Sequence, residues 1–210
     1  RKGIRNFCRF HVSDEPSLEQ YEVYKKRADL IAEIFPGFKV IDALSDIEFF
    51  DKGAVKYPIP SEDHVEDFVG KVDEFWTYYC CGQHNKNVPN RFFAMPSARN
   101  RILGTLLYKY NATGFLQWGY NYWYSQFSKH EIDPFTVTDA GKAFPSGDAF
   151  VVYPSENGQP INSLRLKVFY DGLQDLAAMR LLESLVGREK ALEIVVQDDE
   201  LTFQKYPHGS

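Results

Sequence analysis

The chain has 210 residues, of which 44% are hydrophobic and 25% are charged, a composition typical of globular domains. At roughly 150 residues per domain, we expect one large domain or part of one. The net charge of -5 provides no basic surface for phosphate contacts, so nucleic acid is excluded as an expected partner. No apolar run approaches the ~20 residues of a membrane span.

The first 60 residues predict an alternation of strands and helices. We expect strands over 4–13 and 38–43 and an amphipathic helix over 17–35, which opens with a serine and a glutamine at capping-box spacing. A second Ser–Glu pair predicts a short helix over 45–53. The stretch 55–60 contains two prolines and is expected to be a loop.

The remaining pattern continues the alternation. Its predicted elements are, in chain order, a helix over 61–72, a strand over 75–81, a helix over 97–111, strands over 114–118 and 148–153, and a long helix over 163–186. Residues 188–196 extend that helix or add a further turn. The expected buried side of the long helix carries Leu164, Val168, Leu173, Leu176, Leu181 and Leu185. We interpret the chain as an α/β protein with parallel strands and right-handed crossovers.

Two α/β architectures are compatible with this order: an open doubly wound sheet, or part of a (β/α)8 barrel of ~250 residues. The glycine-rich phosphate turn of dinucleotide-binding sheets does not follow the first predicted strand. Two carboxylates stand there instead, and catalytic groups of barrels lie at the carboxyl ends of strands. The sequence therefore favours the C-terminal part, about strands 4 to 8, of a (β/α)8 TIM-type barrel.

The segment HVSDEP, residues 11–16, contains the most distinctive chemistry. Pro16 breaks the strand, so the adjacent Asp14 and Glu15 can share one site although neighbouring strand side chains point to opposite faces. Two carboxylates held close together have different pKa values, so that one stays ionised while the other carries a proton as a general acid. The alternative is that both residues only cap the following helix.

Aromatic side chains gather near two later strands. In the barrel interpretation, Trp76, Tyr78 and Tyr79 would share a rim with the loop that follows the next strand, WGYNYW, residues 118–123. Flat rings suit the C–H faces of sugars, and Asn121 offers hydrogen bonds to hydroxyl groups. The alternative for these rings is ordinary core packing.

A family resemblance rests on several motifs in a fixed order. HVSDEP, FWTYYCCGQ, PNRFF, RNRILG, GFLQWGYNYW, SGDAFVVYPS and SLRLKVFYDGLQD together resemble the C-terminal part of the catalytic barrel of glycoside hydrolase family 123. The resemblance covers about residues 6–187. Characterised members of that family act on β-linked N-acetylgalactosamine, as in glycosphingolipid glycans, and are similar to other substrate-assisted hexosaminidases.

The resemblance implies roles for the acidic pair. Asp14 would orient the sugar's 2-acetamido group and stabilise an oxazolinium-like intermediate, while Glu15 would act as general acid and base. A tyrosine, Tyr78 or Tyr79, would contact the acetamido carbonyl. The expected substrate-binding residues are His11, Trp76, Tyr78, Tyr79, Asn90, Trp118, Asn121 and Trp123.

The resemblance also implies which part of a larger protein this chain would form. Residues 1–210 would form the C-terminal portion of the catalytic barrel, whose upstream strands, together with a preceding β-sandwich, would lie outside this chain. That upstream half of the same barrel would be required as a partner for the exposed sheet edges. The implied location is extracytoplasmic: secreted, periplasmic or at the cell surface. The expected partner is a glycan substrate.

Alternatives to this function remain open. A glycosidase acting on a different glycan would pair Asp14 or Glu15 with a carboxylate from another strand, such as Asp46 or Asp139. A non-catalytic carbohydrate-binding module would keep the aromatic rim without turnover. The proposed chemistry needs no cofactor and no metal. Three potential zinc ligands, Cys80, Cys81 and His84, lack a fourth at suitable spacing.

Overall fold

The structure is a computed structural model that describes residues 3–197 and 200–207. Its fold is mixed α/β, and the chain forms two compact units. Unit 1 comprises residues 3–78 together with 112–116, and unit 2 comprises residues 79–111 together with 117 onwards.

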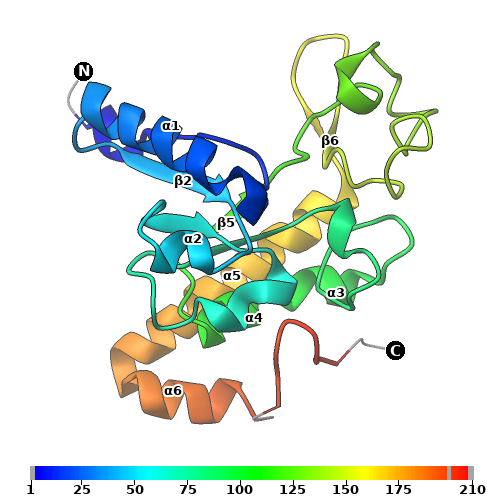
Figure 1. Ribbon diagram of the computed structural model, residues 1–210. Helices are drawn as coiled ribbons and strands as arrows, with labels where there is room; N and C mark the ends of the chain where they lie inside the picture. The colour runs from blue at the N-terminus through cyan, green and yellow to red at the C-terminus, as the bar shows by residue number, and fades with distance from the viewer. Residues whose placement is uncertain (1–2, 198–199, 208–210) are drawn as a thin grey trace. The chain divides into compact units, whose positions relative to one another are not determined.

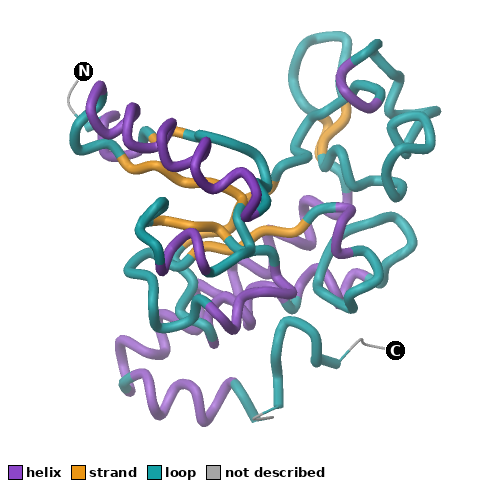
Figure 2. Tube along the Cα trace, viewed as in Figure 1, coloured by secondary structure: helices purple, strands orange, loops and turns teal. Residues whose placement is uncertain are grey.

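Unit 1 is built on parallel strands that follow one another in chain order (Figures 1 and 2). β1 (Arg9–Phe10) pairs with β2 (Lys39–Ala43), and β2 pairs with β3 (Tyr57–Ile59). A parallel bridge between Ser61 and Tyr78 joins the end of β3 to β4 (Trp76–Tyr79), which neighbours β5 (Gly114–Gln117). The carboxyl ends of β1 to β4 therefore lie along one edge.

Two predictions for the first strands are wrong. The predicted strand over 4–13 is reduced to β1, and a 3-10 helix, η1 (Ile4–Phe7), precedes it. Its apolar side chains do not share a buried face, since Phe7 is exposed. The predicted loop over 55–60 contains β3, because proline's fixed φ is compatible with extended backbone and Pro58 aligns with Asp42 of β2.

The first long helix confirms its predicted position. A 3-10 turn, η2 (Leu18–Gln20), leads into α1 (Tyr21–Ile34), and the Gln20 side chain accepts a hydrogen bond from the Ser17 backbone. Figure 1 shows α1 running alongside β2. A buried cluster of unit 1 joins α1 to the end of β2 and to α2 (Glu48–Asp51), and it contains Tyr24, Ala28, Leu44, Phe49, Ala54 and Val55.

The short helices of unit 1 differ from the prediction in detail. Ser45 does not cap α2: the N-cap residue is Ile47, and Asp46, one position earlier, accepts the Glu48 backbone N–H at 3.0 Å. The Ser45 hydroxyl instead lies 2.9 Å from that of Ser61. The predicted helix over 61–72 is a shorter 3-10 helix, η3 (Glu62–Asp67).

Unit 2 is mainly helical. After η4 (Cys81–Gln83), the predicted helix over 97–111 is divided into α3 (Ser97–Arg101) and α4 (Leu103–Lys109). Both pack on α5 (Leu164–Val186), which continues into α6 (Arg188–Val195). A further 3-10 turn is η5 (Gln126–Ser128). The predicted strand over 148–153 is reduced to β6 (Val152–Tyr153), which pairs antiparallel with β7 (Ile161–Asn162).

The leucine stripe that the sequence predicts for α5 is buried only in part. Leu176 is buried as expected, together with Gly172 and Met179, and Val168 and Leu173 are half-buried, whereas Leu164, Leu181 and Leu185 are 71%, 63% and 74% exposed. The reason is the close approach of α4: a Cβ atom on Gly104 would collide with the Gly172 backbone. A contact between two glycines therefore selects the face of α5 that packs.

The described strands do not close a barrel, so the structure supports an α/β fold with an open array of parallel strands. Within the described part of the chain, no helix has the length and apolar character needed to cross a membrane.

Replacing Gly114 with alanine is expected to destabilise the sheet edge of unit 1. A Cβ atom there would lie 2.6 Å from Trp76 Nε1 and closer still to other ring atoms, and overpacking of this kind costs about 1–3 kcal/mol. Denaturant unfolding would show a lower midpoint, and the indole emission would change. Gly82→Ala is the matched control, because its nearest atom lies at 3.5 Å; equal effects of the two variants would contradict this packing.

Candidate active site

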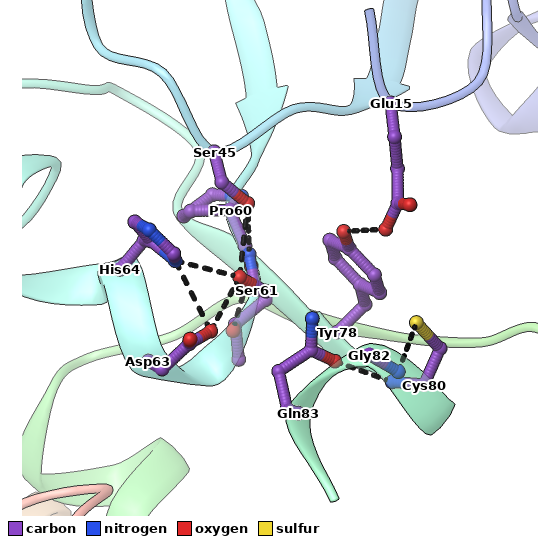
Figure 3. Close-up of polar contacts among 11 residues, drawn as sticks. Glu15, Ser45, Pro60, Ser61, Asp63, His64, Tyr78, Cys80, Gly82 and Gln83 are labelled. Carbon is purple, nitrogen blue, oxygen red and sulfur yellow. Dashed lines mark hydrogen bonds and ion pairs between the residues drawn. The ribbon is translucent and has the colours of Figure 1, made fainter. Parts of the chain in front are cut away.

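The acidic pair lies in the loop that follows β1. Asp14 and Glu15 are both exposed, and the Glu15 backbone N–H donates to the Ala43 carbonyl of β2 at 3.1 Å. Glu15 has a φ of 44°, a left-handed conformation that is uncommon for residues other than glycine and that concentrates at functional sites. The turn directs the Glu15 side chain towards β4, where its carboxylate accepts a hydrogen bond from the Tyr78 hydroxyl (Figure 3).

These contacts weaken the capping alternative. The residue at the N-cap position is Ser17, whose backbone N–H donates to the Gln20 side chain. Glu15 makes its contacts with β2 and β4 instead. A residue that only caps a helix would place its carboxylate on the first N–H groups of that helix, whereas the Glu15 carboxylate accepts a hydrogen bond from Tyr78 in β4.

The three aromatic residues of β4 have different surroundings. Tyr78 is buried, and its hydroxyl donates to the Glu15 carboxylate. Its backbone N–H donates to the Pro60 carbonyl at 3.1 Å. Tyr79, on the opposite face of the strand, packs in unit 2 against Phe92 and the Arg91 guanidinium. Trp76 lies over Gly114 at the start of the strand. Of the two tyrosines, Tyr78 is the one in contact with the acidic pair.

His11 lies beside a buried carboxylate that the sequence analysis did not select. Its Nδ1 is 3.3 Å from Oδ1 of Asp42, and half of the His11 side chain is exposed. Asp42 lies within β2 and is fully buried. The available signal was an aspartate inside the apolar strand segment FKVIDA, because a charged residue in a buried strand requires partners.

A polar cluster at the end of β3 consists of Ser45, Ser61, Asp63 and His64 (Figure 3). The Ser61 hydroxyl donates to Asp63 at 2.6 Å and lies 3.0 Å from His64 Nδ1. Asp63 lies 3.1 Å from the same histidine nitrogen. A nucleophile triad places the serine and the acid on different ring nitrogens, so this cluster is a hydrogen-bonded turn that opens η3.

The predicted sugar-binding loop of unit 2 divides between two environments. Trp118 donates to Asp148 at 3.4 Å and packs on Tyr122 and Phe144. Trp123 is fixed by a hydrogen bond of 3.0 Å from its indole to the Val152 carbonyl. A cavity of about 330 Å³ opens beside it, with this lining: Tyr120, Asn121, Trp123, Val152, Pro154, Ser155, Gly158, Gln159 and Pro160.

Asn90 belongs to the interior of unit 2. It is 1% exposed, and its side-chain oxygen lies 3.5 Å from the Phe92 backbone nitrogen. Its side-chain nitrogen is buried without a hydrogen-bond partner among the described residues, and its role as a substrate contact stays a prediction.

Asp148 is the second buried carboxylate that the sequence analysis missed. Burial raises its pKa to about 6, against the opposing effects of hydrogen bonds from Trp118 and the Cys81 backbone and of the charges on Arg91 and Arg165. Arg165 donates to the carbonyls of Arg91, Gly147 and Phe150 at 2.6–2.9 Å. Asp148 and its two arginines thus form a polar interior for unit 2.

The cysteine and histidine residues near η4 have local contacts. Cys80 Sγ accepts the Gly82 N–H at 3.4 Å, and His84 Nδ1 lies 2.7 Å from the Cys81 carbonyl. Within residues 3–197 and 200–207, no three His, Cys, Asp or Glu side chains are grouped so as to hold a metal ion.

Asp148 is expected to make the stability of the protein depend on pH. Because its pKa is higher in the folded than in the unfolded state, the folded protein binds the extra proton between about pH 4 and pH 6, and the free energy of unfolding falls as pH rises through that window. Asp148→Asn removes this contribution to the pH dependence and is expected to stabilise the protein at pH 7 by on the order of 2 kcal/mol.

Denaturant titrations at pH 4.5 and 7 measure this effect. Asp133→Asn is the matched control, since Asp133 is an exposed turn residue that accepts the Phe135 N–H at 3.0 Å. The same change of stability between the two pH values in the unsubstituted protein and in Asp148→Asn would contradict the raised pKa.

Comparisons with known proteins agree with one another. The family model of the glycoside hydrolase 123 catalytic domain matches residues 1–182. Among solved structures, a family 123 glycoside hydrolase from Clostridium perfringens, described in work on glycolipid glycan hydrolysis, superposes with a TM-score of 0.67 and 18% sequence identity. The match covers 92% of this chain and 34% of that one. A search of curated proteins gives no significant match. The chain belongs to the catalytic-domain family of glycoside hydrolase 123.

Proposed function

We propose that the protein is a retaining β-N-acetylhexosaminidase, with N-acetylgalactosamine as the preferred sugar, that uses the substrate's own 2-acetamido group as nucleophile. The observation that carries the proposal is the Asp14–Glu15 turn, whose two adjacent carboxylates are exposed at the carboxyl edge of parallel strands, with Glu15 bonded to Tyr78. Membership of the family and the glycolipid glycan substrate of its Clostridium perfringens relative support the choice of substrate.

Each carboxylate has a separate task in this reaction. The acetamido oxygen attacks the anomeric carbon while the bond to the leaving oxygen breaks, and Glu15 gives that oxygen its proton. Asp14 holds the acetamido N–H and stabilises the positive charge of the cyclic intermediate. Water then attacks the same carbon and gives its proton to Glu15, while the bond from that carbon to the acetamido oxygen breaks and restores the acetamido group. Two inversions at one carbon give net retention of configuration.

The alternative with a distant second carboxylate has less support. Asp46 accepts the Glu48 backbone N–H, and Asp139 accepts the N–H groups of Gly141 and Lys142 at 3.1 and 2.9 Å. Both are therefore engaged in turns. A carbohydrate-binding module without turnover is favoured by one feature, the cavity beside Tyr120, Asn121 and Trp123, and the activity assay below separates it from the enzyme.

We also propose that this chain supplies about strands 4 to 8 of a (β/α)8 barrel and needs the upstream half to work. The parallel strands of unit 1 follow chain order, as barrel strands do, and the chain spans about a third of the solved relative. The exposed leucines of α5 offer apolar surface for such a partner. An extracytoplasmic location stays a prediction from the family.

Hydrolysis of two aryl β-glycosides by the natural full-length protein tests the mechanism. The N-acetylgalactosaminide is expected to be cleaved and the matching galactoside, which lacks the acetamido nucleophile, is expected to be left intact. Asp14→Asn and Glu15→Gln should each lower kcat by roughly 10²–10⁴. The Glu15→Gln loss should shrink with more acidic phenol leaving groups, because they need less protonation, whereas the Asp14→Asn loss should not.

Glu19→Gln and Asp29→Asn are matched controls, since both residues are exposed in the following helical segment. Equal turnover of the two glycosides would overturn substrate assistance. Glycan binding that survives both active-site substitutions, with no turnover by any variant, would favour the binding module.

Tyr78→Phe is expected to lower kcat by roughly 10- to 100-fold, because it removes the hydroxyl that orients Glu15, and a hydrogen bond to a charged group contributes about 1.5–3 kcal/mol. KM should change little. Tyr57→Phe in β3 is the control for loss of a phenol hydroxyl in the same sheet. Unchanged kcat in Tyr78→Phe would show that Glu15 does not depend on this contact.

A further inference from the structure

A single buried carboxylate holds the backbone that leads to the acidic pair. Oδ1 of Asp42 accepts the backbone N–H groups of Val12 at 2.8 Å and Ser13 at 3.1 Å. Its other oxygen, Oδ2, accepts the Tyr24 hydroxyl of α1 at 2.5 Å. Asp42 is 0% exposed, and the half-exposed His11, whose Nδ1 lies 3.3 Å from Oδ1, is its neighbour towards the solvent.

The location of Asp42 explains why the chain needs a carboxylate there. β1 ends at Phe10, so the N–H groups of Val12 and Ser13 no longer have carbonyl partners on the neighbouring strand. Backbone N–H groups that lose their ladder partners must be satisfied in another way. One Asp42 oxygen takes both, and it thereby fixes the path of the chain as it leaves the sheet.

The next residue of β2 completes the attachment. The Ala43 carbonyl accepts the Glu15 N–H at 3.1 Å, so two consecutive residues of β2 hold the segment Val12–Glu15 at both ends. Glu15 adopts its left-handed φ of 44° within this segment. Such a conformation persists only where the surroundings determine it, and the two attachments to β2 provide that determination.

Burying this charge is unfavourable by itself. Burial raises the pKa of the Asp42 carboxyl, and the hydrogen bonds from Tyr24, Ser13 and Val12 oppose that effect. A buried carboxylate is tolerated where such bonds saturate its oxygens. An apolar side chain at this position would avoid the desolvation but would leave two N–H groups without an acceptor.

We propose that Asp42, held in place by Tyr24, is a positioning residue that sets the orientation of Asp14 and Glu15 for catalysis. The catalytic part of this inference rests on the proposed function. The structural part concerns only the segment Val12–Glu15 and can be tested without turnover. Asp42 acts through the backbone and does not touch the substrate.

Three variants of the natural full-length protein test the proposal: Asp42→Ala, Asp42→Asn and Tyr24→Phe. With the aryl β-N-acetylgalactosaminide, Asp42→Ala should lower kcat by roughly 100-fold, the scale of a 1 Å misplacement of catalytic groups, with KM changed by less than about threefold. Asp42→Asn should recover about tenfold of that loss, because its amide oxygen still accepts both N–H groups. Tyr24→Phe should lower kcat by about tenfold.

A stability control separates positioning from general damage. Phe68→Leu removes core volume from a fully buried site in unit 1 and should lower the thermal midpoint while leaving kcat near the unsubstituted value. Asp29→Asn provides the same chemical change on the exposed side of α1. A loss of kcat in Phe68→Leu as large as in Asp42→Asn, at equal loss of stability, would overturn the positioning role.

Amide hydrogen exchange tests the same contacts independently of activity. The N–H groups of Val12 and Ser13 should exchange at least about tenfold faster in Asp42→Ala than in the unsubstituted protein, with a smaller increase in Asp42→Asn. Unchanged exchange would overturn the proposal. If neither the unsubstituted protein nor any variant cleaves the substrate, the proposed function fails. The exchange data then still decide whether Asp42 holds this segment. If Asp42→Ala does not fold, Asp42→Asn and Tyr24→Phe decide.

Discussion

The carboxylate of Asp42 is the interaction on which the geometry of the acidic pair depends. It lies within a buried strand yet bonds to Val12 and Ser13, about thirty positions earlier in the chain. Through these bonds β2 fixes the path of the backbone that leads into the exposed turn. A charged group inside the sheet is costly in free energy, and this cost is offset by hydrogen bonds that also order the site.

Parallel strands in chain order explain why the surrounding polar groups lie together in unit 1. Glu15 follows β1, Ser45 follows β2, Ser61 follows β3 and Tyr78 lies near the end of β4. Parallel pairing brings those positions to one edge, as the Ser61–Tyr78 bridge demonstrates. Each residue is local in sequence to its own strand, and only the register of the sheet makes neighbours of them.

Unit 2 also contains a buried carboxylate, and its partners are different side chains. Its interior contains Asp148 and two arginines, and the guanidinium of Arg91 lies between the rings of Tyr79 and Phe169. Two aromatic residues that the sequence suggested for sugar contacts, Tyr79 and Trp118, contact these buried charged groups. Within the 118–123 loop, the Trp123 ring is held by a hydrogen bond to the Val152 carbonyl and also lines the cavity.

The sequence by itself determined the α/β class, the helix that begins after Ser17, the strands near 39–43 and 76–79, and the adjacency of Asp14 and Glu15, because periodicity and capping act between residues close in the chain. It did not identify β3, the buried face of α5 or the roles of Asp42 and Asp148. Pairing with β2 outweighed the proline within β3, and the close approach of Gly104 and Gly172 outweighed the leucine pattern of α5. Only the tertiary structure decided which backbone groups a buried carboxylate meets, because strand register joins residues that are far apart in sequence.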